Sequence, residues 1–242
     1  MLERAMDERM LQARGVLLDL DGTLMAGGQA LPGAAAALRR LGARCAIVSN
    51  DAEHTPAELA AKLRAAGLAM EESRILLAGA LAVDSLSRER PGCRVLMLTS
   101  PSLIGHARAQ GLRPASGEAD AVILGRDRTF TYEKLQAAAR AVRGGALLVV
   151  CNPDLTHPGP GGAVVPETGA LLAALLACTG AVPYRVVGKP EPALFLAGMA
   201  RLGSTAASTV MFGDNPATDG VGARRLGITF IEALPHKLAE AA

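Results

Sequence analysis

The sequence predicts an α/β fold with a parallel β-sheet at its centre, and three observations support this. Short apolar runs of strand type alternate along the 242 residues with alanine-rich segments of helical period. The run at residues 15–21 is apolar up to its acidic end, as expected of a strand that helices bury on both faces. Polar residues gather where the runs end, and open parallel sheets bind ligands at the carboxyl ends of their strands.

The first and last thirds of the chain contain the clearest strand and helix signals. The predicted helix at 32–41 begins with a proline and is followed by Gly42, and the one at 55–66 begins with Thr55-Pro56 and stops at Gly67. The predicted strands are residues 15–21, 44–50, 184–188, 208–214 and 228–231. The predicted helices are residues 32–41, 55–66, 192–202 and 220–226.

The middle third predicts a separate set of strands and helices. Strands are expected at 94–98, 121–124 and 146–151, and helices at 132–142 and 168–178. The cluster of glycine and proline at 158–166 predicts an irregular loop. If the outer thirds form one sheet, this middle third is an insertion with its own core. The expected domains are therefore residues 1–76 and 184–242 for the core, and 77–183 for the insertion.

Composition excludes several classes of protein. Half of the residues are hydrophobic, which argues against disorder, and aromatic residues make up only 2%, with no tryptophan. That scarcity argues against a surface that stacks nucleic-acid bases. A net charge of +2 gives no electrostatic reason to expect a nucleic-acid or membrane partner.

The cysteines and the hydropathy pattern predict a cytoplasmic protein. The four cysteines lie far apart without metal-binding spacing, and Cys45 and Cys151 fall in apolar strands where buried free thiols are expected. Residues 1–8 lack the apolar centre of a signal peptide. The longest apolar stretches are too short to cross a bilayer.

The first motif that carries chemistry is Asp19-Leu20-Asp21-Gly22-Thr23-Leu24, at the end of an apolar strand. Two carboxylates at one strand end repel each other, so their shared burial is costly unless a cation or a reaction requires it. Gly22 allows a sharp turn directly after them. The alternative is a strand-end turn with solvated acids.

Three further strand ends carry polar residues, and each is a weak signal alone. A Ser-Asn pair can simply start a loop, a single lysine is usually solvated, and an Asp-Asn pair can form an Asx-turn. Their order and their shared place at strand ends make the combination informative. They are Ser49-Asn50, Gly188-Lys189-Pro190 and Gly213-Asp214-Asn215-Pro216-Ala217-Thr218-Asp219.

In order, these four motifs (DLDGTL, SN, GKP and GDNPATD) resemble those of the haloacid dehalogenase-like hydrolases. The insertion between the second and third motifs resembles the class II cap arrangement of that superfamily. The resemblance implies a Rossmann-like parallel-sheet core with an inserted α/β cap domain.

The amino-acid sequence is most similar to one branch of the superfamily. This branch contains p-nitrophenyl phosphatases, phosphoglycolate phosphatases, pyridoxal phosphatases and bacterial nucleotide phosphatases. The similarity runs from about Gly15 to Ile231. The matching segments are residues 31–34 (LPGA), 128–135 (RTFTYEKL), 151–154 (CNPD), 168–171 (TGAL) and 187–190 (VGKP).

The resemblance implies a role for each charged residue at the strand ends. Asp19 would be the nucleophile that forms an aspartyl-phosphate, and Asp21 would protonate the leaving oxygen and later activate water. Mg²⁺ would be held by the Asp19 carboxylate, the Asp21 backbone carbonyl and Asp214, while Asp219 would orient metal-bound water. Dehalogenases of the superfamily lack the second acid, so Asp21 favours phosphoryl transfer.

The phosphate itself would be held by three groups. The resemblance assigns this role to Ser49, the Asn50 backbone and Lys189, and Lys189 would also offset the charge of Asp19. In the cap, Asn152, Asp154 and His157 are candidates for contact with the leaving group. His157 could equally be an ordinary loop histidine.

Three positions depart from the family pattern and are interpreted as changes of specificity. Asp51 replaces an asparagine, Glu167 replaces a glycine, and Ala217 replaces an acidic residue. An acid beside a phosphate site weakens binding, so Asp51 is expected to point away or to pair with a group such as His54.

The predicted function is a Mg²⁺-dependent phosphatase for small phosphomonoesters. A cap that closes over the site favours a small phosphorylated metabolite as the partner, and neither nucleic acid nor membrane is expected. Relatives of the branch often dimerise through the cap, so a homodimer formed through the cap is one expectation for this chain. The alternatives are a catalytically silent protein that binds a phosphorylated ligand or a partner, and a phosphotransferase.

Overall fold

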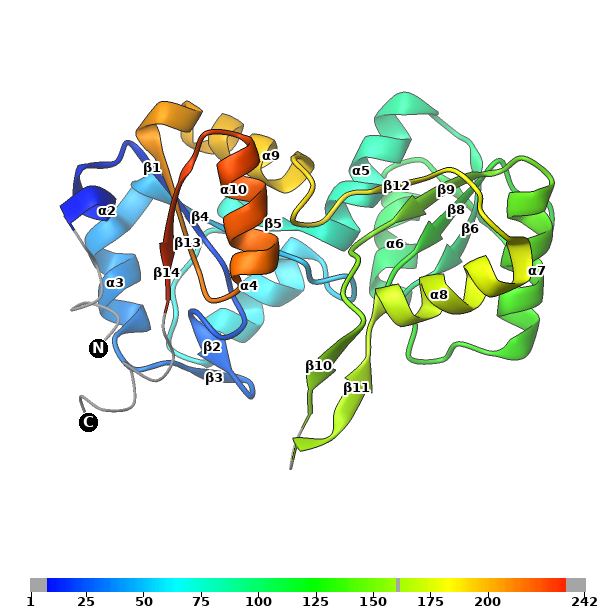
Figure 1. Cartoon of the computed structure of the whole chain (residues 1–242), viewed down its shortest axis with the longest axis horizontal. Coiled ribbons are helices and arrows are strands. Elements are labelled where there is room, and N and C mark those ends of the chain that lie inside the picture. Colours follow the sequence, from blue (N-terminus) through cyan, green and yellow to red (C-terminus); the bar gives the residue numbers. More distant parts are fainter. Residues whose placement is uncertain (1–7, 160–161, 234–242) are drawn as a thin grey trace. The chain divides into compact units, whose positions relative to one another are not determined.

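The computed structural model describes residues 8–159 and 162–233. These residues form two compact units, each built around its own sheet (Figure 1). Within the described part of the chain, the first unit contains residues 8–49, 56–76 and 189–233, and the second contains 50–55, 77–159 and 162–188. The prediction about a signal peptide in residues 1–8 falls, except for Glu8, outside the described residues.

The first unit contains a five-stranded sheet in the order β14-β13-β1-β4-β5. The central strand β1 pairs in parallel with both β4 and β13, and β13 pairs in parallel with β14. The three central strands are buried along their whole length, as the apolar runs predict. The strands are β1 (Gly15–Leu18), β4 (Cys45–Ser49), β5 (Ile75–Leu77), β13 (Thr209–Gly213) and β14 (Thr229–Glu232).

Helices cover this sheet, and α9 lies against its centre. A side chain at Gly198 of α9 would meet the Leu17 and Val48 side chains, so a glycine allows the helix to pack directly on β1 and β4. A short hairpin, β2 (Met25–Ala26) with β3 (Gln29–Ala30), follows β1. The helices are α2 (Glu8–Gln12), α3 (Ala34–Leu41), α4 (Pro56–Ala65), α9 (Ala193–Leu202) and α10 (Val221–Arg225). Short turns of 3₁₀ type occupy Gly42–Arg44, Glu72–Arg74 and Ala206–Ser208, and a π turn occupies Pro216–Gly220.

The second unit contains a parallel sheet in the order β12-β9-β8-β6-β7. Leucine and valine side chains on one face of this sheet form a core with α7 and α8. Helices α5 and α6 pack on each other on the other side of the sheet, and α6 contacts β7 (Figure 1). The strands are β6 (Arg94–Leu98), β7 (Arg113–Ala115), β8 (Ala121–Leu124), β9 (Leu147–Val150) and β12 (Tyr184–Val186). The helices are α5 (Ala78–Glu89), α6 (Pro101–Ala109), α7 (Tyr132–Arg143) and α8 (Thr168–Thr179).

The structure confirms the predicted fold class, a parallel-sheet core with an inserted α/β unit, but it moves two boundaries. Residues 184–186 were expected in the core sheet, whereas β12 pairs with β9 and extends the sheet of the second unit. Residues 50–55 were expected in the core and group instead with the second unit. A strand of three residues carries no sign of which sheet it joins, because both sheets offer parallel partners.

The loop expected at 158–166 is also different from the prediction. Two strands, β10 (Thr156–Pro158) and β11 (Val164–Pro166), pair in antiparallel register at its ends. Proline ends both strands, which is compatible with an isolated ladder of two short strands because proline needs only a free edge for its missing N–H. Residues 160 and 161 lie outside the described part.

The burial of two cysteines agrees with the prediction from the sequence. Cys45 and Cys151 are buried free thiols, and burial raises the pKa of Cys45 to about 11 and that of Cys151 to about 12. Neither thiol is reactive at neutral pH. Across residues 8–159 and 162–233, every helix is too short or too polar to span a bilayer.

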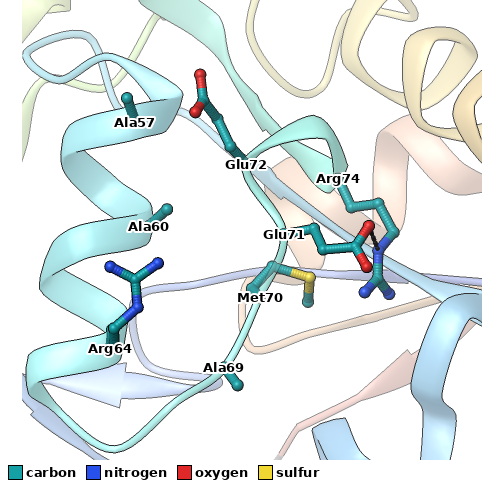
Figure 2. A pocket seen from close by; sticks show the side chains of 8 residues that line it. All are labelled: Ala57, Ala60, Arg64, Ala69, Met70, Glu71, Glu72 and Arg74. Atoms are coloured by element: carbon teal, nitrogen blue, oxygen red, sulfur yellow. Dashed lines mark ion pairs between the residues drawn. The ribbon is translucent and has the colours of Figure 1, made fainter.

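A surface cavity of about 560 Å³ lies in the first unit between α4 and the segment 69–74 (Figure 2). Alanine side chains of α4 face it, and Arg64, Glu71, Glu72 and Arg74 give it mixed charge. None of its lining residues belongs to the four motifs. The cavity is therefore separate from the strand ends that carry the predicted chemistry.

Candidate active site

Three neighbouring strands of the first unit bring the motif residues together. Asp19 follows β1, Ser49 ends β4, and Asp214 follows β13. Because β1 lies between its two parallel partners, the carboxyl ends of all three strands meet at one edge of the sheet. The Asp19 amide donates to the Phe212 carbonyl at 2.9 Å, which continues the ladder to the base of the motif.

Lys189 links two of the acids in the interior of the first unit. Its Nζ lies 2.6 Å from Asp19 Oδ1 and 2.7 Å from Asp219 Oδ1. Burial alone lowers the pKa of Lys189, but the negative charges of Asp19 and Asp219 outweigh that effect and raise it above its usual value. The lysine is therefore a fixed positive charge.

Thr23 holds the second oxygen of Asp19. Its Oγ1 donates to Asp19 Oδ2 at 3.1 Å, and the threonine is fully buried. Together with Lys189, this contact engages both oxygens of the Asp19 carboxylate. The sequence placed Thr23 inside the first motif without giving it a role. Its small hydroxyl one turn after the acid was the signal that could have indicated one.

Asp19, Asp214 and Asp219 form a compact acidic cluster. One carboxylate oxygen from each lies within 4.8 Å of the others. Burial and the charge of Asp19 raise the pKa of Asp214 to about 7, and burial raises that of Asp219 to about 6 although Lys189 opposes the shift. A single lysine does not neutralise three acids.

This donor set fits a hard divalent cation. The three groups offer only oxygen, the ligand that Mg²⁺ prefers, and a cation would relieve the repulsion that raises their pKa values. Asp219 was expected to orient metal-bound water, whereas the structure also gives it a direct ion pair with Lys189. The Asp21 side chain is exposed and lies outside the three-acid cluster, so its backbone carbonyl stays the atom predicted to face the metal.

Gly22 makes the close approach of the two motif loops possible. Its φ of +79° lies in the left-handed region, which favours glycine. A Cβ at this position would lie 2.0 Å from Asp214 Oδ2. Any larger residue at position 22 would displace the Asp214 carboxylate from the turn.

The predicted phosphate-binding residues of the second motif fall on either side of a boundary between the units. Ser49 is buried at the end of β4 in the first unit. Asn50, which is bonded to it, belongs to the second unit, where its side chain donates to Asp154 Oδ2 at 3.0 Å. The prediction used the backbone of Asn50, and the side chain is directed to Asp154.

Asp51 pairs with His54, as one of the two expectations stated. Asp51 Oδ1 accepts from the Glu53 and His54 amides, and Oδ2 lies 2.7 Å from His54 Nδ1. Burial would raise the pKa of Asp51, but the hydrogen bonds and charge of His54 outweigh it and lower the pKa. The negative charge of Asp51 is therefore balanced by hydrogen bonds from Glu53 and His54 in the same turn.

Glu167 and His157 form a second pair in the second unit. His157 Nδ1 on β10 lies 2.6 Å from Glu167 Oε1, and Arg126 Nε lies 3.4 Å from the same oxygen. Burial raises the pKa of Glu167 although Arg126 and His157 oppose the shift. Arg126 also contacts Glu53, with 3.1 Å between Nη1 and Oε2.

The remaining predicted residues are divided between the units. Asn152 and Asp154 lie together in the second unit, where Asn152 Oδ1 accepts from the Asp154 amide at 3.1 Å. Ala217, the third departure from the family pattern, lies exposed in the π turn after β13 and donates its amide to Asn215 Oδ1. The Asx-turn considered for this motif is therefore present beside the carboxylate cluster.

Comparison with known proteins identifies the family. The family model described as haloacid dehalogenase-like hydrolase matches residues 16–113, and the one described as HAD-hydrolase-like matches residues 186–234. The chain is 31% identical over 206 residues to dihydroxyacetone phosphatase of Corynebacterium glutamicum, covering 84% of this chain and 74% of that protein.

A second relative is known in sequence and structure. The chain is 36% identical over 223 residues to D-glycerol 3-phosphate phosphatase of Mycobacterium tuberculosis, covering 90% of this chain but spanning only 62% of that protein's length. The crystal structure of glycerol phosphate phosphatase from this organism in complex with magnesium superposes with a TM-score of 0.86 at 34% identity, covering 95% of this chain and 71% of that one. Both units are thus found in proteins of known structure, and the chain belongs to the haloacid dehalogenase-like hydrolase family.

Proposed function

We propose that the chain is a Mg²⁺-dependent phosphatase that hydrolyses small phosphomonoesters through an aspartyl-phosphate on Asp19. The observation that carries this proposal is the Asp19 carboxylate itself, held by Lys189 at 2.6 Å and by Thr23 at 3.1 Å beside two further acids. A buried, oriented carboxylate is a nucleophile once the charge around it is balanced.

In the first step, an oxygen of Asp19 attacks phosphorus and the bond from phosphorus to the leaving oxygen breaks. Asp21 donates its proton to that oxygen, for which its exposed position two residues after the nucleophile is suited. In the second step, Asp21 takes a proton from water, the water oxygen attacks phosphorus, and the bond to Asp19 breaks. Inorganic phosphate leaves, and both acids return to their starting states.

The positive charges of the site allow an anionic nucleophile to approach an anionic phosphate. Mg²⁺ held by Asp19, the Asp21 carbonyl and Asp214 would supply charge neutralisation and a template for the phosphate. Lys189 supplies a fixed positive charge, and Asp219 keeps it in place. Ser49 and the backbone of Asn50 donate hydrogen bonds to the transferring oxygens.

The charged residues of the second unit favour a substrate whose leaving group is small and carries no negative charge. The guanidinium of Arg126 contacts both Glu53 and Glu167, so it is not a free cation for a carboxylate. Asp154 and His157 are the candidates for contact with leaving-group hydroxyls. The relatives described above are named dihydroxyacetone phosphatase and D-glycerol 3-phosphate phosphatase. We therefore place phosphates of small polyols and ketoses first among the substrates.

Phosphate release tests this proposal. The wild type, Asp19→Asn and Asp21→Asn are incubated with p-nitrophenyl phosphate, glycerol 3-phosphate, dihydroxyacetone phosphate and phosphoglycolate, with Mg²⁺ or with chelator. We expect Mg²⁺-dependent release by the wild type only. An inactive wild type on a broad panel of metabolite phosphates favours the silent ligand-binding alternative. Release that depends on an added alcohol, with a phosphorylated product, favours the phosphotransferase.

A further inference from the structure

The first crossing of the chain into the second unit, residues 50–55, is held there along its backbone. Four successive carbonyls, those of residues 50 to 53, each accept a hydrogen bond from within the second unit. The donors, in that order, are Asn152 Nδ2 at 2.6 Å, the Gly79 amide at 3.0 Å, the Arg126 amide at 3.3 Å and the Ser100 hydroxyl. This segment has no regular secondary structure, so these contacts fix its path.

The last crossing of the chain out of the second unit ends at Gly188. This glycine lies close to the first crossing, residues 50–55. The Gly188 amide donates to the Cys151 carbonyl at 2.7 Å. A Cβ at Gly188 would lie 2.6 Å from Asn50 Oδ1, 2.7 Å from the Cys151 carbonyl oxygen and 3.0 Å from Asn152 Cβ. Only a glycine lets the two crossings approach this closely.

Asn152 is the side chain that touches both crossings. Its Nδ2 donates to the Asn50 carbonyl, its Oδ1 accepts from the Asp154 amide, and its Cβ would lie 3.0 Å from a Cβ added at Gly188. The residue is only 1% exposed. A buried amide whose oxygen and nitrogen are both engaged inside the protein is poorly placed to read a substrate.

We propose that Asn152 is a positioning residue that fastens the two crossings to each other. Asn50 is bonded to Ser49 and Gly188 is bonded to Lys189, so the clamp sets the spacing of the chain segments that carry two of the phosphate-binding groups. This role rests on the proposed function of Ser49 and Lys189. It differs from a contact with the leaving group, because a misplaced phosphate grip slows every substrate alike.

The kinetic test compares substrates that differ in their leaving groups. Asn152→Ala and Asn152→Asp both remove the donor to the Asn50 carbonyl, and the second keeps an acceptor for the Asp154 amide. We expect each to lower kcat/KM by about tenfold, by the same factor for p-nitrophenyl phosphate and for glycerol 3-phosphate. His157→Ala is the contrast, with a loss that differs between the two substrates.

Gly188→Ala keeps the test decisive if an Asn152 variant fails to fold. Its Cβ pushes the last crossing away from Asn152, so we expect the same uniform loss. The double variant with Asn152→Ala should lose less than the product of the single losses, because both changes disturb the same junction between the two crossings. A loss confined to glycerol 3-phosphate, or unchanged activity in both Asn152→Ala and Gly188→Ala, would overturn the proposal.

Amide hydrogen exchange gives a readout that needs no activity. We expect Asn152→Ala to speed exchange at residues 50–53 and 187–189 together, leaving α7 and α8 unchanged. Arg94→Ala, which removes an exposed ion pair with Asp120 at the opposite edge of the same sheet, is the control and should change neither crossing. Unchanged exchange at both crossings contradicts the clamp. An inactive wild type with faster exchange in Asn152→Ala contradicts only the proposed function.

Discussion

Lys189 and Asp19 are 170 residues apart in the chain and form a buried ion pair with 2.6 Å between Nζ and Oδ1. The pair joins the third motif to the first across the whole inserted unit. Removing one partner of such a pair leaves a buried charge without compensation, which costs far more than the pair itself contributes. The two partners should therefore respond differently to substitution.

Lys189→Met should destabilise the metal-free protein by about 3 kcal/mol, because the three crowded acids lose the cation that pairs with two of them. Activity should fall below detection. Urea unfolding of the metal-free protein measures the change, and Lys62→Met on α4 is a control that removes the same charge from an exposed position. Equal stability of the two variants would contradict the account.

Asp19→Asn should leave the metal-free protein as stable as the wild type or more stable by about 1 kcal/mol, although it abolishes turnover. The substitution removes one of three repelling acids, and Asp219 remains at 2.7 Å from Lys189. The same unfolding experiment measures it. A destabilisation as large as that of Lys189→Met would show that the Asp19 pair outweighs the repulsion.

Thr23→Val should lower kcat by about tenfold with little change in KM, because Asp19 loses the hydrogen bond that orients its second oxygen. Thr23→Ser keeps the hydroxyl and should recover most of the activity. Steady-state kinetics with p-nitrophenyl phosphate checks both variants. If Ser and Val are equally impaired, the methyl packing of Thr23 matters and the hydrogen bond does not.

Stability in the absence of metal should fall as the pH rises. Burial and the charge of Asp19 raise the pKa of Asp214 from 3.8 to about 7 in the metal-free protein. A carboxyl whose pKa rises on folding stabilises the protein while it is protonated, and this contribution is lost between about pH 4 and about pH 7. Mg²⁺ should therefore raise Tm more at about pH 8 than at about pH 5.

Thermal unfolding with and without Mg²⁺ at the two pH values measures this linkage. Asp214→Asn is the matched control and should lose most of the Mg²⁺ effect at both. An equal Mg²⁺ shift at both pH values in the wild type would mean that Asp214 does not titrate against the cation.

Glu167→Gln should shift the substrate preference toward carboxylated phosphates. The substitution removes the negative charge that His157 and Arg126 contact, so His157 loses its ion-pair partner and Arg126 keeps only Glu53, which leaves one less acid to repel a second anionic group. We expect kcat/KM for phosphoglycolate to rise about tenfold relative to glycerol 3-phosphate. Glu118→Gln, which removes an exposed partner of Arg94, should leave the ratio unchanged. An unchanged ratio in Glu167→Gln would place this network away from the substrate.

The strand ends of the site could be predicted from the sequence because each motif follows a continuous apolar run. The order of Asp19, Ser49 and Asp214 was therefore sufficient to place them at one edge of a sheet. The contact of Asp219 with Lys189 was not predictable in this way, because it depends on a π turn that carries Asp219 back under β13. The role of Thr23 was not predictable either, because it depends on the direction in which the hydroxyl points.

The second unit was less predictable for physical reasons. Helix α5 begins at Ala78 directly after β5 ends at Leu77, with no proline or polar residue to mark the change and with Gly79 inside the first turn of the helix. The path of residues 50–55 depends on donors far away in sequence, such as Arg126 and Asn152. Contacts of that kind leave no local pattern, so the segment was assigned to the core.

The most direct test of the central claim is to trap the covalent intermediate. The enzyme is mixed with substrate and Mg²⁺, quenched in acid during steady-state turnover, digested and analysed by mass spectrometry. We predict one peptide, containing Asp19, that carries an added phosphoryl group which alkali removes, and no such group in Asp19→Asn. Turnover without a phosphorylated Asp19, or a phosphoryl group on another residue, would contradict the account.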